Sequence, residues 1–158
     1  MNPAEFIAKY QAAVIEACSG SAIFPSVKMA QAAVETGWGK SIPNNNMFGI
    51  KAAGAHTPYW NGESKISNTR EVINGISGQY NLAFRSYASL ADSIRDHTYF
   101  LQVNARYTAA GVFTAKTPQD QCKALQKAGY ATDPNYANTL IGIIKTNNLE
   151  SLDQKKKL

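Results

Sequence analysis

The stretch that decides the fold is AQAAVETGWGKS at residues 30–41, followed by NMFGIKA at residues 46–52. Ser26 is a good N-cap, and the apolar residues after it recur at helical spacing. Gly37 allows the chain to turn sharply, so a helix is predicted to end at that point. Glu35 then lies in the last helical turn, close in sequence to Trp38.

Glu35 has the surroundings of a carboxylic acid that stays protonated near neutral pH. The negative end of a helix dipole and the neighbouring indole of Trp38 both disfavour a carboxylate charge. Hydrolysis of a glycoside needs such an acid to protonate the leaving oxygen, and a second group to stabilise or capture the positive sugar carbon. The alternative is an ordinary surface glutamate at a helix end, and position alone does not separate the two.

The rest of the chain predicts a helical body interrupted by a small β lobe. Apolar residues at helical spacing predict helices over residues 3–19, from 89 onward, over 117–128 and from 133–134 onward. The β lobe is expected at about residues 52–84, where Asn74-Gly75 between two β-type runs predicts a hairpin. The predicted fold class is therefore mainly α (α+β), as a single domain over residues 1–158.

Composition fits one globular domain and limits the partners. The chain has 158 residues, 44% of them hydrophobic and 17% charged, enough for a sizeable core. The net charge of +5 suits an anionic polymer but does not choose between nucleic acid and cell wall. Part of this charge lies in a basic tail at residues 153–158, which is expected to be solvated. No apolar run reaches the roughly 18 residues of a membrane span, so no span is expected.

Few residues suggest a metal, a cofactor or a disulfide. Cys18 and Cys122 each lie within a helical pattern, which favours buried free thiols over a disulfide between them. No His, Cys and Asp cluster has metal-ligand spacing, so no metal or cofactor is expected. His97 falls on the apolar stripe of its helix and is interpreted as a packed histidine.

The two opening stretches resemble the glucosaminidase domain of glycoside hydrolase family 73, whose core reads roughly AQAALESGWGKS and then NLFGIKA. The resemblance continues in the family's order through TRE at residues 69–71, FRSY at 84–87 and GYATDPNYA at 129–137. Several blocks in the right order, spread over nearly the whole chain, are far more specific than any one block. The resemblance implies a lysozyme-like fold and cleavage of the β-1,4 bond from N-acetylglucosamine to N-acetylmuramic acid in peptidoglycan.

The resemblance also implies roles for three residues. Glu35 matches the family's general acid, and Glu71 matches the glutamate of its T-x-E motif, proposed as the second carboxylate. Tyr130 matches a tyrosine that lines the cleft near the reacting sugar. The family often has an aromatic residue just after the second glutamate, whereas this chain has Val72.

Four further residues are candidates for binding the substrate. Trp60 lies in a polar loop, where sugar stacking explains a large aromatic better than packing does. Phe48 is expected in the core beneath the cleft, with one edge towards the sugar. Asn46 either hydrogen-bonds an acetamido group or stabilises its own loop. For Tyr136, a ligand contact and a structural role remain alternatives.

Other functions are compatible with the same fold. A lytic transglycosylase also needs one glutamate but makes an anhydro product, and a non-catalytic wall-binding or assembly module needs neither Glu35 nor Glu71. A nucleic-acid binder would rest on charge alone, without a motif. We expect a monomer that acts on peptidoglycan strands of the bacterial cell wall, in the periplasm or outside the cell. Because residues 1–9 lack a secretory pattern, a phage lysis enzyme, a secreted effector and a domain of a larger autolysin all remain open.

Overall fold

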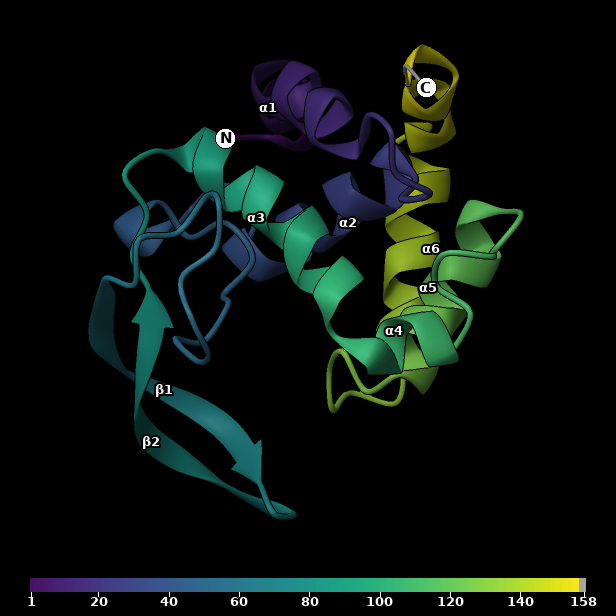
Figure 1. Cartoon of the computed structure of the whole chain (residues 1–158). Coiled ribbons are helices and arrows are strands. Elements are labelled where there is room, and N and C mark those ends of the chain that lie inside the picture. The colour runs from purple at the N-terminus through teal and green to yellow at the C-terminus, as the bar shows by residue number, and fades with distance from the viewer. Residues whose placement is uncertain (157–158) are drawn as a thin grey trace.

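The computed structural model describes residues 1–156 (Figure 1). In chain order its elements are α1 (Pro3–Cys18), α2 (Pro25–Thr36), η1 (Pro43–Asn45), β1 (Ser64–Ile73), β2 (Ile76–Arg85), α3 (Leu90–Val103), α4 (Ala105–Ala109), α5 (Pro118–Lys127), α6 (Tyr136–Thr146) and η2 (Leu149–Lys155). Helix α2 packs against α1, α5, α6 and η2. The predicted mainly α fold with a small hairpin lobe is confirmed.

Helix α2 is the centre of the core because ten of its twelve residues are buried, polar ones such as Lys28 and Gln31 among them. Val27, Met29, Ala30 and Ala32 are all fully buried. Its small side chains let the neighbouring helices approach closely. The last turn of α2, which carries Glu35, is therefore held in place from several directions.

The helix starts follow the predicted capping residues at α3 and α5 but not at α2 or at α6, which begins at Tyr136 with Asn135 rather than Asp133 as its N-cap. The side chains of Ser89 and Thr117 accept hydrogen bonds from backbone N–H groups of α3 and α5, as predicted. Ser26 is not the N-cap of α2, which begins at Pro25. The N–H and hydroxyl of Ser26 instead donate to the carboxylate of Asp153 at 2.8 and 2.7 Å. The cap prediction was wrong because a partner 127 residues away takes these groups.

The C-terminal segment is ordered onto the body as far as the structure describes it. Leu149 and Leu152 of η2 are 1% and 3% exposed, and Asp153 binds the start of α2. The Lys156 ammonium donates to the carbonyl of Ser21. The prediction of a solvated tail therefore does not hold for Asp153 and Lys156, which bind the body, whereas Gln154 and Lys155 are exposed. Residues 157–158 lie outside the described residues.

Both cysteines are free and buried, in agreement with the favoured interpretation. Burial raises the pKa of Cys18 to about 11 and that of Cys122 to about 12. Such thiols remain protonated at neutral pH and pack as small apolar groups. Within residues 1–156, no helix combines the length and the hydrophobicity needed to cross a membrane.

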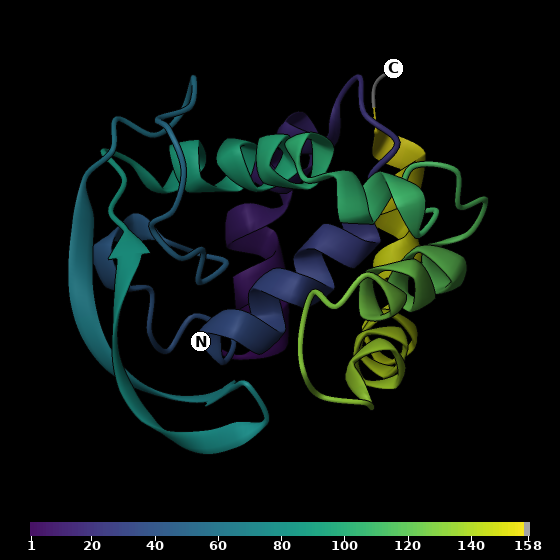
Figure 2. The ribbon, with the colours of Figure 1, turned by 60° about the horizontal axis from the view of Figure 1, so that its bottom comes forward.

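The β lobe is a two-stranded antiparallel hairpin that leaves one side of the helical body and bends beneath it in the view of Figure 2. Asn74 and Gly75 form its turn with φ of 52° and 77°, the left-handed conformation that this pair favours. At the other end of the hairpin, the Arg85 N–H donates to the Ile50 carbonyl. The strands span residues 64–85, and irregular chain occupies much of the predicted lobe before residue 64.

Candidate active site

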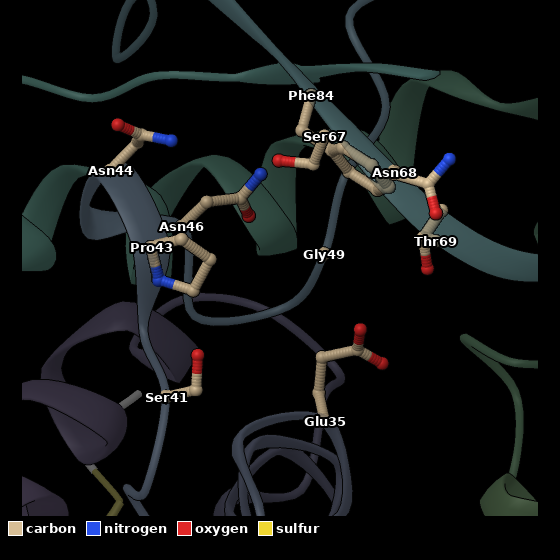
Figure 3. A pocket seen from close by; sticks show the side chains of 10 residues that line it. All are labelled: Glu35, Ser41, Pro43, Asn44, Asn46, Gly49, Ser67, Asn68, Thr69 and Phe84. Carbon is tan, nitrogen blue, oxygen red and sulfur yellow. The ribbon is translucent and has the colours of Figure 1, made fainter. Parts of the chain in front are cut away.

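A cavity of about 320 Å³ lies between the end of α2, the following loop and the hairpin. It is lined by Glu35, Ser41, Pro43, Asn44, Asn46, Gly49, Ser67, Asn68, Thr69 and Phe84. Figure 3 shows Glu35 projecting from the helix end towards Gly49, with the residues of β1 across the cavity. The two lobes therefore share this cavity, and each contributes polar groups to it.

Gly49 leaves room for the Glu35 carboxylate. A Cβ atom added at Gly49 would lie 2.2 Å from Oε1 of Glu35, and the backbone of Gly49 has a φ of 64°. A side chain at this position would displace the Glu35 carboxylate, and the left-handed backbone conformation strongly favours glycine. The Glu35 carboxylate thus occupies the space that a side chain at residue 49 would fill, which links the two sequence blocks NMFGIKA and AQAAVETGWGKS.

The Glu35 carboxyl is a weaker acid than an ordinary glutamate. Solvent reaches it from the cavity, yet protein surrounds it closely enough that partial burial raises its pKa from 4.5 to about 6. The negative charge of Glu71 raises the pKa further, whereas the positive charge of Lys51 opposes the shift. A substantial fraction of Glu35 is therefore protonated near pH 6, which suits a proton donor.

Glu71 reaches the same region from β1. Strand alternation places it on the same face as Ser67 and Thr69, which line the cavity. Its side chain is 29% exposed, and its Oε1 lies 3.8 Å from Nζ of Lys51. Sequence reasoning missed Lys51, although the residue stands within the NMFGIKA block.

Tyr130 follows α5 and belongs to an aromatic stack. Its ring lies parallel to that of Tyr136, with centroids 5.6 Å apart, and its hydroxyl is 3.0 Å from Nε2 of His97. The hydroxyl of Tyr136 accepts from Nε2 of Gln31, and the side chain is 7% exposed. This placement favours the structural alternative for Tyr136. The charge of Glu35 contributes to raising the pKa of Tyr130, although burial is the main cause.

Phe48 lies in the core, as expected. It is 4% exposed, and its ring stacks on His97 with centroids 3.8 Å apart. His97 is fully buried, which agrees with the prediction of a packed histidine.

Asn46 borders the cavity but uses its side chain to hold the loop. Its Nδ2 donates to the carbonyls of Ile50 and Arg85, and its Oδ1 accepts from the Ile50 N–H. These bonds tie the loop to the base of the hairpin, so the geometry favours the loop-stabilising alternative.

Trp60 does not offer a face to a sugar, so that prediction was wrong. It is 5% exposed, its Nε1 donates to the Glu63 carbonyl at 2.7 Å, and the Arg85 guanidinium lies 4.2 Å from the ring. The polar neighbours in the sequence suggested exposure. However, Arg85, at the end of β2 and 25 residues later in the chain, lies over the indole in a cation–π contact.

Arg85 also belongs to a buried polar cluster that ties the hairpin base to α3. Its Nη1 lies 2.7 Å from Oδ2 of Asp96, and the Tyr87 hydroxyl donates to the same oxygen at 2.5 Å. Thr57 donates to the other oxygen of Asp96 at 2.6 Å. The FRSY block contains Arg85 and Tyr87, but sequence reasoning did not predict the cluster. Within residues 1–156, no group of three acidic, His or Cys side chains is placed to hold a metal ion.

The fold and the cavity define a class of enzyme: a lysozyme-like glycoside hydrolase, with a glutamate in the cavity between a helical body and a β lobe. The model of the glucosaminidase family, described as mannosyl-glycoprotein endo-beta-N-acetylglucosaminidase, matches residues 11–149. The chain belongs to the glucosaminidase family, and the resemblance to family 73 is confirmed.

Relatives with known names agree on the class. The chain is 38% identical to the peptidoglycan hydrolase FlgJ of Pseudomonas aeruginosa, over 89% of this chain and 36% of that protein. It is 34% identical to a probable N-acetylmuramidase of Lactococcus lactis, over 94% of this chain and 34% of that protein. It also resembles the crystal structure of the catalytic domain of the Listeria monocytogenes autolysin Auto, with a TM-score of 0.77 and 34% identity over 94% and 86% of the two chains. The chain thus spans only about a third of the length of these two curated relatives.

Proposed function

We propose that this chain hydrolyses peptidoglycan at the bond from N-acetylglucosamine to N-acetylmuramic acid, with Glu35 as the general acid. The observation that carries the proposal is the carboxyl of Glu35 in the shared cavity, with its pKa raised to about 6. Relatives named as peptidoglycan hydrolases and an autolysin support the substrate. The net positive charge suits a polymer that carries carboxylates.

In this mechanism the proton of Glu35 passes to the glycosidic oxygen as the bond between that oxygen and the anomeric carbon breaks. Water finally adds to the anomeric carbon and gives up a proton to a carboxylate, which restores the starting charges. Glu71 is proposed either to activate that water or to orient the acetamido group of the sugar. In the second route the acetamido oxygen attacks the anomeric carbon first, so the enzyme needs no nucleophile. Tyr130 is proposed to contact the reacting sugar.

The identity of the sugar at the new reducing end tests which glycosidic bond is cleaved. Purified peptidoglycan is digested, reduced with borohydride and analysed by mass spectrometry. We expect glucosaminitol. Muramitol would instead make the chain a muramidase, as the name of the Lactococcus lactis relative suggests for that protein. Anhydro-muramyl ends would make it a lytic transglycosylase.

We further propose that the chain acts on the cell wall outside the cytoplasm, as a monomer. The support is the class of its relatives, among them the Enterococcus faecalis autolysin. Sedimentation of the purified protein tests the monomer, because a dimer would sediment with twice the mass of 17.1 kDa.

A further inference from the structure

Lys28 is buried in the centre of the molecule without an acidic partner. It lies on α2, two turns before Glu35, and is 0% exposed. Its Nζ is 2.6 Å from Nδ1 of His97 and 3.2 Å from the carbonyl oxygen of Ile94. Among residues 1–156, no carboxylate lies within ion-pair distance of this ammonium. Buried lysines are rare and costly, so a role in packing alone does not explain this one.

The contact with Lys28 determines which nitrogen of His97 carries the proton. Burial lowers the pKa of Lys28 to about 8, so the group is still mainly an ammonium at pH 7. An ammonium group can only donate hydrogen bonds, so Nδ1 of His97 accepts and Nε2 carries the hydrogen at that pH. Burial and the charge of Lys28 lower the pKa of His97 well below 6.5, so the ring stays neutral. The parallel stack on Phe48 holds the ring in its plane.

Nε2 of His97 then donates to the Tyr130 hydroxyl, 3.0 Å away. Because the phenol oxygen accepts this bond, its own proton must be donated elsewhere. No other hydrogen bond to this hydroxyl is formed within residues 1–156. Its pKa is raised by burial and by several charges, that of Glu35 among them, so the phenol keeps its proton and lies within electrostatic range of the proton donor.

We propose that Lys28 and His97 are positioning residues that commit the Tyr130 hydroxyl to donate a hydrogen bond to an oxygen of the N-acetyl sugar bound beside Glu35. With the opposite tautomer of His97, the phenol would donate to Nε2 and its proton would be used within the protein. The charges facing Lys28 come from Asp96 on α3 and, when ionised, from Cys18 on α1, and neither forms an ion pair with it. The inference rests on the proposed function of the cavity, but its first step is a property of the free protein.

The first experiment needs no substrate. A long-range proton–nitrogen NMR spectrum distinguishes the two neutral histidine tautomers. The chain has two histidines, and the exposed His56 is removed by His56→Gln to assign the signals. We expect His97 with hydrogen on Nε2, and a mixture of tautomers in Lys28→Met. Hydrogen on Nδ1 in the parent protein would overturn the proposal, even if Lys28→Met failed to fold.

The second experiment asks whether Lys28 acts through Tyr130. Lys28→Met is expected to lower kcat on purified peptidoglycan about fivefold, the scale of one misdirected hydrogen bond, with little change in KM. In a Tyr130→Phe background the same substitution should have no further effect. Met29→Leu, a buried change on the same helix, is the control for disturbed packing. An equal loss from Lys28→Met in both backgrounds would show that Lys28 does not act through the phenol.

Failure of this inference and failure of the proposed function give different results. If the parent protein does not cleave peptidoglycan, the proposed function fails, whereas the tautomer measurement still decides the first step. If the parent cleaves peptidoglycan and Tyr130→Phe is equally active, the function stands and the donor role of Tyr130 is overturned.

Discussion

The helical body and the hairpin hold their glutamates in opposite ways. Glu35 extends from a helix whose other faces are buried among four elements. Glu71 lies on a strand that pairs with one other strand, and Ile66 and Ile76 of this hairpin are 76% and 66% exposed. Few buried contacts mean low local stability, so the hairpin is the part expected to move when a glycan binds. Glu35 is thus held by packing, whereas Glu71 depends on the polar bonds at the hairpin base.

The largest expected effect is the loss of activity on substitution of Glu35 in the helical body. Glu35→Gln keeps the shape of the side chain and removes the transferable proton, so activity on purified peptidoglycan should fall at least about a hundredfold. Glu63→Gln, at an exposed glutamate before β1, is the matched control and should stay near parental activity. Near-normal clearing of walls by a folded Glu35→Gln variant would remove the general acid from the mechanism.

The Asp96→Asn substitution tests whether the buried polar cluster around Asp96 holds the hairpin base to α3. This change leaves the buried Arg85 without its counter-charge and weakens the bonds from Tyr87 and Thr57, so it should destabilise the protein by about 3 kcal/mol. Asp92→Asn on the same helix is the control, because the partly exposed pair of Asp92 with Arg95 is worth less than about 1 kcal/mol. Denaturant unfolding measures both, and similar small losses would show that the cluster does not anchor the hairpin.

Loss of the hairpin carboxylate should have an intermediate effect. Glu71→Gln is expected to lower activity about tenfold, less than Glu35→Gln, because the acetamido group of the substrate can still attack the anomeric carbon. Turnover of the same wall preparation by the two variants gives the comparison. Parental activity would show that Glu71 is not catalytic, and a loss equal to that of Glu35→Gln would make it the sole base or nucleophile.

The pH profile shows how the two lobes are coupled. Because Glu35 must be protonated, kcat/KM should fall as the pH rises through about 6. The charge of Glu71 raises this pKa, so Glu71→Gln should move the falling limb to lower pH. Lys51→Met should move it to higher pH, because Lys51 lowers the same pKa. A limb that stays in place in both variants would mean that another group controls it.

The smallest expected effect is the change in the free energy of unfolding caused by Glu35→Gln. The pKa of Glu35 is about 6 in the folded protein and 4.5 as the ordinary value, so its charge opposes folding above pH 6 and has no effect below pH 4.5. The Glu35→Gln variant should therefore unfold at a higher temperature than the parent protein at pH 7.5. Because the group is reached by solvent, the gain should stay below about 1 kcal/mol. Thermal unfolding at pH 7.5 and pH 4 measures it, and a gain of equal size at both values would contradict the cause.

Local signals in the sequence predicted the parts that depend on neighbours in the chain. Ser89 and Thr117 begin helices, and Asn74-Gly75 forms a hairpin, because caps and tight turns are decided within a few residues. Glu35 was predicted as the general acid both from its helix end and from the family resemblance, and the structure places it in the cavity. The proposed reason for its pKa was incomplete, since Trp38 packs edge-on against Phe6 and the charge of Glu71 contributes to the shift.

What could not be predicted depends on partners far apart in the chain. The interpretation of Trp60 failed because Arg85 covers it, 25 residues later, and its polar neighbours gave no sign of that cover. Lys28 is a single charge in an apolar run, and nothing in the sequence indicates that its ammonium contacts His97, 69 residues later. Side chains that satisfy each other across the fold leave no periodic pattern in the sequence.

The two native cysteines should not compete with cysteines introduced for labelling, because both are buried. With pKa values of about 11 and 12 and no exposure, Cys18 and Cys122 should react slowly with maleimides at neutral pH. Cysteines introduced at the exposed Ile76 on the hairpin and at the exposed Lys127 on α5 would therefore take up a pair of spin or fluorescent probes selectively. The distance between such probes would follow the hairpin in solution as glycan is added, in a protein that keeps both of its native cysteines.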